Sequence, residues 1–296
     1  MRERKERSKA LKSENLEGQP KNVNEKELDE AIAELDALVG LSAVKDEVKS
    51  LCNLIKVRQI RLERGLRVPE LSQHLVFSGK PGTGKTTVAR IIGRIYHSLG
   101  FLSKGQFVEA DRSKLVAGYV GQTALKTQDV ITQALGGVLF IDEAYSLSPK
   151  YKEDFGAEAI ETILKAMEDH RDDFVVIVAG YDELMEEFIT SNPGLQSRFK
   201  KYIHFQDYKG DELLDIFLGL LEKNNYGIDI NVLPFLSSYF EKLYLNRTNT
   251  FGNARDVRNL FEKVIEKQAN RIVQINAPSD EDLLKIKLED FGGLIK

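Results

Sequence analysis

The chain has little of several residue types that mark secreted, metal-binding or membrane proteins. It contains no tryptophan and a single cysteine, Cys52, in 296 residues, so no disulfide can form within it. Its four histidines are scattered without the spacing of metal ligands, which argues against a structural metal site. No apolar run is as long as a membrane span, and the charged beginning lacks the apolar stretch of a secretion signal. We therefore expect a cytoplasmic protein without a membrane partner.

The charge of the chain argues against non-specific binding to nucleic acid. The net charge is -4 and the pI is about 5.8, so there is no overall attraction to nucleic acid. Arg198, Lys200 and Lys201 form a small basic patch, but no aromatic residues are interleaved with them. That pattern favours a subunit interface over a nucleic-acid groove. Cys52 lies within a helical apolar pattern, which favours packing over a reactive thiol.

Apolar segments alternate with helix-like segments over residues 27–206 and then give way to helical patterns alone. This alternation predicts an α/β domain with a parallel sheet flanked by helices, followed by a small all-helical domain over 207–296. Residues 1–26 mix both charge signs with few apolar residues, so we expect a disordered extension. The predicted strands are Leu75 to Ser78, Gln106 to Glu109, Gly137 to Asp142, Phe174 to Ala179 and Tyr202 to Phe205.

A phosphate-binding loop, GKPGTGKT at residues 79–86, is the most specific motif in the chain. It lies between a predicted strand and a predicted helix, as such a loop must. Glycines let the backbone turn around a polyphosphate with its N–H groups pointing inward, beside the positive end of the helix. Lys85 should reach the terminal phosphates, and the Thr86 hydroxyl should bind magnesium. The nucleotide-binding residues expected here are Gly79, Pro81, Gly82, Thr83, Gly84, Lys85, Thr86 and Thr87.

Two acids end the predicted buried strand VLFI, giving VLFIDE at residues 138–143. Asp142 would hold the magnesium, directly or through water. Glu143 would orient the attacking water or accept its proton. The alternative is a pair of solvated acids at a strand end, which the neighbouring phosphate loop makes less favoured.

Six motifs together resemble one family: LVGL from Leu38, HLVFSGKPGTGKTTVAR from His74, VLFIDEAYSL from Val138, VVIVAGYDELM from Val175, NPGLQSRF from Asn192 and GNARDVRN from Gly252. Over residues 27–276 the chain is similar to the AAA+ ATPases of the CbbX and SpoVK type, a family of P-loop NTPases that includes red-type Rubisco activase. The resemblance implies an AAA+ P-loop NTPase fold with a helical lid, ATP and Mg²⁺ as cofactors, and a homo-oligomer, in the family a hexamer, that acts on a protein client.

The resemblance also implies roles for residues outside the phosphate loop. Arg198 matches the arginine finger that reaches the neighbouring subunit's ATP; the alternative is a surface arginine. Arg255 matches an arginine that contacts the terminal phosphate from the lid; the alternative is an ion pair with Asp256 or another acid. Val39 and Gly40 match the segment that packs on the adenine.

Tyr119, Val120 and Gly121 match the loop that projects into the central pore of such rings and grips a polypeptide. An aromatic side chain can hold varied sequences by contact area, and flanking glycines permit movement. The alternative is a tyrosine packed over the sheet edge with its hydroxyl bonded. Gly180 and Tyr181 depart from the wider AAA+ pattern, which has asparagine or threonine there to position the water. The polar partner of the water is therefore left open.

These observations favour an ATP-driven ring that remodels a protein client through the loop of Tyr119. A nucleotide-dependent assembly switch with slow hydrolysis is the alternative from a different class. A nucleic-acid-stimulated ATPase is less favoured because the chain is acidic and has no recognition module. The resemblance does not identify the client, since fold-level analogy does not supply specificity.

Overall fold

The computed structural model describes residues 24–69, 71–119, 121–149 and 154–294. Most of the predicted extension, 1–26, lies outside these residues. The first described helix, α2 (Glu25–Ala37), begins two residues earlier than the predicted domain start at Glu27. It begins there because the side chain of Asn24 accepts a hydrogen bond from the amide of Glu27 over 3.3 Å, which caps the helix.

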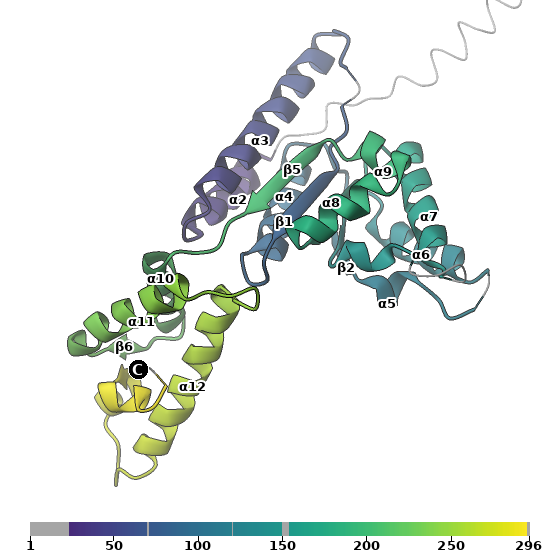
Figure 1. The fold of residues 1–296 in the computed structure, drawn as a ribbon. Helices are drawn as coiled ribbons and strands as arrows, with labels where there is room; N and C mark the ends of the chain where they lie inside the picture. Colours follow the sequence, from purple (N-terminus) through teal and green to yellow (C-terminus); the bar gives the residue numbers. More distant parts are fainter. Residues whose placement is uncertain (1–23, 70, 120, 150–153, 295–296) are drawn as a thin grey trace, which may run out of the picture.

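A five-stranded parallel sheet forms the centre of the larger domain (Figure 1). Its strand order is β2-β3-β4-β1-β5. The strands are β1 (Leu75–Gly79), β2 (Phe107–Ala110), β3 (Val138–Ile141), β4 (Val175–Gly180) and β5 (Lys201–Phe205). Each lies within one or two residues of its predicted position. β3 and β4 are buried along their whole length, as their continuous apolar sequences predict for a sheet covered on both faces.

Helices cover both faces of this sheet (Figure 1). Along β1 the side chains alternate between the two layers: Leu75 and Phe77 join one hydrophobic cluster, and Val76 joins the other. The first layer contains α2, α3 (Ser42–Glu63) and α4 (Lys85–Ser98). The second contains α5 (Arg112–Leu115), α6 (Thr123–Ala134), η1 (Ala144–Leu147), α7 (Gly156–Asp169), α8 (Asp182–Thr190) and α9 (Pro193–Arg198). Cys52 is buried in α3, as its apolar pattern predicts.

The smaller domain, hereafter the lid, packs around a cluster of phenylalanines that includes Phe217, Phe240 and Phe291. Besides its helices it contains a pair of two-residue parallel strands, which the expectation of an all-helical domain did not include. Its elements are α10 (Gly210–Lys223), β6 (Gly227–Ile228), η2 (Ile230–Val232), α11 (Leu233–Leu245), α12 (Ala254–Ile272), α13 (Asp280–Leu284), β7 (Lys285–Ile286) and η3 (Leu288–Phe291).

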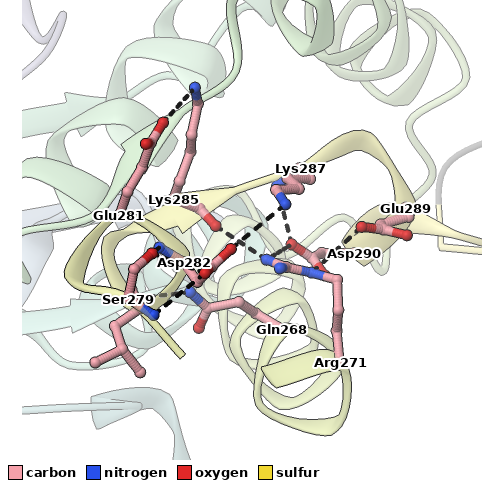
Figure 2. Close-up of polar contacts among 10 residues, drawn as sticks. Gln268, Arg271, Ser279, Glu281, Asp282, Lys285, Lys287, Glu289 and Asp290 are labelled. Carbon is pink, nitrogen blue, oxygen red and sulfur yellow. Dashed lines mark hydrogen bonds and ion pairs between the residues drawn. The ribbon is translucent and has the colours of Figure 1, made fainter. Parts of the chain in front are cut away.

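A polar network fixes the last described segment of the lid against α12 (Figure 2). Arg271 donates to Asp290 through two nitrogens, over 2.8 and 2.9 Å, and to the carbonyl oxygen of Lys285 over 3.0 Å. Gln268, one turn earlier on α12, donates to the carbonyl oxygen of Leu283 over 2.8 Å. The Asp290 side chain is almost fully buried, so this pair is a structural element of the lid.

No helix in the part of the chain that the structure describes is both long and apolar enough to cross a membrane.

Candidate functional site

One cavity of about 330 Å³ lies where the carboxyl ends of β1, β3 and β4 meet the start of α12. In an open parallel sheet this edge is where ligands bind, because successive strand ends deliver their loops to one crevice. The predicted site residues that line it are Gly79, Pro81, Gly82, Thr83, Gly84, Lys85, Thr86, Thr87, Asp142, Glu143 and Arg255. The structure therefore brings together most of the residues that the sequence singled out.

The phosphate loop presents a positively polarised backbone to this cavity. Gly82 and Gly84 have φ angles of 72° and 95°, which side chains rarely adopt. α4 begins at Lys85 without a side-chain cap and without an acid in its first turn. The first N–H groups of a helix have no intrahelical partner, and here no capping side chain accepts from them either. They therefore stay available to an anion. An uncapped helix start in a polar cavity fits the phosphates of a nucleotide.

Lys85 is held inside the loop by two backbone oxygens. Its Nζ donates to the carbonyls of Gly79 and Lys80, over 2.7 and 2.8 Å. Burial lowers the pKa of the Lys85 ammonium from its ordinary value, while the carboxylates of Asp142 and Asp182 act in the opposite direction.

Asp142 and Glu143, which follow β3, line the same cavity as the phosphate loop. Asp142 is half-buried and Glu143 is exposed, so both carboxylates are accessible. Glu143 has a left-handed backbone with φ of 48°, and its amide donates to Asp142 Oδ1 over 3.0 Å. The hydroxyl of Thr86 lines the same cavity. Hydroxyl and carboxylate oxygens are the ligands that Mg²⁺ prefers, so this donor set fits magnesium.

The lid contributes Ala254, Arg255 and Arg258 to the cavity. No ion pair of Arg255 is found among the described residues; Asp256, its predicted alternative partner, instead accepts from the amide of Gly252 over 2.8 Å. Arg258 was missed by the sequence analysis. The signal was available, because residues three apart on a helix share a face and Arg255 had already been placed there.

Gly180 and Tyr181 also line the cavity, where the wider family pattern has a small polar residue. A Cβ on Gly180 would lie 2.7 Å from the Tyr145 ring and 2.8 Å from Met185 Sδ. The ring of Tyr181 lies 6.2 Å from that of Tyr145. The packing of Tyr145 against the strand end therefore leaves no room for a side chain at position 180.

Val39 and Gly40 do not line the main cavity. Gly40 has φ of 60°, and a Cβ there would lie 2.1 Å from Glu212 Oε1 of α10, so the turn is pressed against the lid. The adjoining Leu41 lines a second cavity of about 100 Å³ together with Tyr208 and other residues of the segment before α10. The turn thus lies beside the phosphate loop and the lid, and its contact with adenine stays a prediction.

Arg198 and Tyr119 also lie outside the main cavity. Arg198 is at the end of α9, where its Nη2 is 3.4 Å from Glu168 Oε2. Tyr119 is 74% exposed, so it does not pack over the sheet edge, which was the alternative to a pore loop. Gly118 and Gly121 have no neighbouring atoms where a Cβ would lie. Val120, the third predicted pore residue with Tyr119 and Gly121, lies outside the described residues.

Comparison with known proteins identifies the family. The model of the ATPase family associated with various cellular activities matches residues 75–207, and that of the AAA lid domain matches 209–295. Stage V sporulation protein K of Bacillus subtilis is 43% identical over 90% of this chain and 83% of its own length. The chain belongs to the AAA+ ATPases of the CbbX and SpoVK type. Protein CbbX of Cereibacter sphaeroides is 42% identical over 88% of this AAA+ chain and 85% of its own.

Two further similarities are consistent with this membership. The chloroplastic ribulose bisphosphate carboxylase/oxygenase activase of Cyanidioschyzon merolae is 40% identical over 90% of this chain and 91% of its own. A mutant of RuvB from Thermotoga maritima matches in structure, with a TM-score of 0.57 over 86% of this chain and 69% of that one. At 20% sequence identity, the RuvB match concerns the fold alone.

Proposed function

We propose that this AAA+ protein forms a ring, hexameric by family expectation, that hydrolyses ATP with Mg²⁺ and uses the loop of Tyr119 to remodel a protein client. The observation that carries the proposal is the single cavity shared by the uncapped phosphate loop, two carboxylates and two lid arginines. An apolar binding module would not gather these groups, whereas phosphoryl transfer needs all of them.

Each group of the cavity has a role in this proposal. Magnesium ATP, when bound, supplies the phosphoanhydride bond whose hydrolysis drives the ring. Lys85 and Arg255 would bind the terminal phosphates, and Thr86 and Asp142 would hold the metal. Glu143 would accept a proton from water at its carboxylate. The adenine would lie near Val39 and Gly40.

The position of Arg198 supports a site shared between subunits. The guanidinium does not line the cavity of its own chain, and its 3.4 Å contact is long and made to an exposed carboxylate, that of Glu168, so the contact costs little to release. A planar guanidinium suits phosphate oxygens because it donates several hydrogen bonds from a fixed geometry. A separated subunit would then have an incomplete site.

The ring is tested by the ATPase rate per subunit across a dilution series, with Arg198→Ala beside the wild type. Arg171→Ala is the matched control, because Arg171 also lies near Glu168, at 3.9 Å, on the same side of the domain. We expect the rate per subunit to fall on dilution and to collapse in Arg198→Ala alone. A rate that neither dilution nor Arg198→Ala changes would refute the shared site.

The pore loop is tested with Tyr119→Ala and Tyr119→Phe, using casein as an unfolded protein probe. We expect casein to stimulate the ATPase of the wild type and of Tyr119→Phe, since the aromatic side chain supplies the contact area in both. Tyr119→Ala should keep its basal ATPase and lose the stimulation. Stimulation that survives in Tyr119→Ala would favour the assembly switch, in which the loop does not grip a client.

A further inference from the structure

We propose that the ion pair between Lys80 and Asp207 positions the phosphate loop relative to the lid arginines, which makes both of them positioning residues for ATP hydrolysis. This inference rests on the proposed ATPase function and deepens it. Neither residue lines the cavity of the phosphate loop, so neither is placed to touch the phosphates of the substrate; Asp207 lines the smaller cavity beside Leu41.

Lys80 acts at two places through its two ends. Its backbone carbonyl, inside the phosphate loop, accepts hydrogen bonds from Lys85 Nζ and Thr83 Oγ1, each over 2.8 Å. Its side chain extends to the lid side, where Nζ lies 3.0 Å from Asp207 Oδ2 and 3.4 Å from the carbonyl oxygen of Thr248. Lys80 therefore links Lys85, which would bind phosphate, to the segment of Asp207 that joins the two domains.

Asp207 lies in the segment that joins β5 to α10, and its side chain is only 15% exposed. Oδ2 accepts from Lys80 and forms an ion pair with Arg247 of the lid, whose Nε lies 3.3 Å away. Oδ1 accepts from Asn253 Nδ2 over 2.9 Å. A partly buried carboxylate with two hydrogen-bond donors and a second ion pair is held more firmly than an exposed ion pair.

Asn253 links Asp207 to α12, the helix that carries Arg255 and Arg258. It is fully buried, with φ of 53°, and directly precedes α12. Besides Asp207 it contacts the carbonyl oxygen of Pro81 over 3.3 Å, and its Oδ1 accepts from the amide of Tyr208 over 2.9 Å. α12 then carries Arg255 and Arg258 into the cavity. The path from Lys80 through Asp207 and Asn253 to α12 is a continuous set of hydrogen bonds.

The Lys80 charge can be removed without breaking the rest of the path, because Asp207 keeps Arg247 and Asn253 as partners. The lid should then rest at a wider range of angles to the phosphate loop. Displacing a charge-stabilising group from the terminal phosphate affects the transition state more than substrate binding. We therefore expect Lys80→Met to lower kcat about ten- to hundredfold, with KM for ATP changed less than about threefold.

The kinetic test compares Lys80→Met, Asp207→Asn, the double variant and Lys80→Arg. The double variant should be no slower than the slower single variant, and Lys80→Arg should recover most of the rate because it restores the charge. Lys49→Met is the matched control, since Lys49 pairs with Asp36 over 2.9 Å on the surface of α3 and α2. A normal rate in Lys80→Met, or losses that simply multiply in the double variant, would overturn the inference.

A second readout needs no nucleotide. Spin labels on Glu187→Cys in α8 and Glu262→Cys in α12, in a Cys52→Ala background, report the distance between the two domains. We expect the distance distribution to broaden in Lys80→Met and to narrow again in Lys80→Arg, with Lys49→Met like the wild type. Equal distributions in Lys80→Met and Lys49→Met would overturn the coupling. A wild type without ATPase activity would instead refute the proposed function, and the distance measurement would still decide the coupling.

Discussion

The amide of Ala254, the first residue of α12 in the lid, donates a hydrogen bond to the carbonyl oxygen of Gly82 in the phosphate loop over 3.2 Å. The two segments are as close here as backbones can be, since a Cβ on Gly82 would lie 2.1 Å from the carbonyl oxygen of Gly252. A glycine at position 82 thus serves the packing of the lid as well as the turn around the phosphates.

Replacement of this glycine should separate the two domains. In Gly82→Ala the methyl group meets Gly252 O, and the left-handed backbone, with φ of 72°, adds about 1–2 kcal/mol of strain. We expect ADP affinity to fall at least about tenfold, by about 1.4 kcal/mol or more, when measured by calorimetry.

Gly65→Ala is the matched control for Gly82→Ala. Gly65 has φ of 64° with nothing within 4 Å of its Cβ position, so it adds the backbone strain without the collision. It should leave ADP binding unchanged. Equal ADP affinities in the two variants would mean that the close approach at Gly82 has no part in nucleotide binding.

Removing the charge of Glu143 should separate binding from turnover. An amide cannot accept the proton of the attacking water, so Glu143→Gln should lose at least about 100-fold in ATPase rate while it keeps ATP affinity. Glu187→Gln, which changes an exposed acid of α8, is the control and should be fully active. ATP hydrolysis at the wild-type rate in Glu143→Gln would remove this residue from the mechanism.

The sheet was predictable from local sequence patterns. Five apolar segments, each separated by enough residues for a helix, are typical of a parallel sheet in an α/β domain. Helix starts were less predictable. Asn24 caps α2 through a single side-chain contact. The low apolar content of residues 1–26 had predicted disorder up to this helix, so its start was placed too late. The β6 and β7 pair was missed because two-residue strands have no periodicity to detect.

The phosphate loop and the acids at the end of β3 were predictable because each is a contiguous motif. Asp207 was not identified, since its importance depends on contacts across the domain boundary, whereas Arg258 was missed although its helical spacing from Arg255 was visible in the sequence. Lys80 and Asp207 are 127 positions apart in sequence, and nothing in either local sequence indicates that they meet. Tertiary placement of single charged residues is information that a single sequence does not display.

The pair of Arg271 and Asp290 should contribute strongly to the stability of the lid. Arg271→Met leaves the buried Asp290 carboxylate without its two-nitrogen partner, which typically costs about 3–5 kcal/mol. We expect that loss in the free energy of unfolding of the lid, measured by urea denaturation. Lys285→Met, which removes an exposed pair with Glu281, should cost less than about 1 kcal/mol. Similar losses in the two variants would contradict the assignment of Arg271 as a structural residue.

His74 should make stability depend on pH in a defined window. It is buried, its Nδ1 accepts from the amide of Val176 over 3.0 Å, and burial lowers its pKa from 6.5 to about 4. The nearby Arg198 charge lowers this pKa further, whereas a hydrogen bond to the Met167 backbone opposes the shift. The His74 imidazole therefore stays neutral in the native state at pH values where it is protonated in the unfolded chain.

Between pH 6.5 and 4 the unfolded state binds more protons, so the free energy of unfolding must fall as the pH falls. The full stability is present above pH 6.5, and protonation of His74 in the unfolded chain removes roughly 3 kcal/mol of it by pH 4. His74→Asn keeps an acceptor for Val176 and should lose that part of the slope, whereas His170→Asn, at an exposed site, should keep it. The measurement is urea denaturation of all three proteins across this window. Parallel curves for wild type and His74→Asn would show that His74 titrates in the folded protein as it does in the unfolded chain.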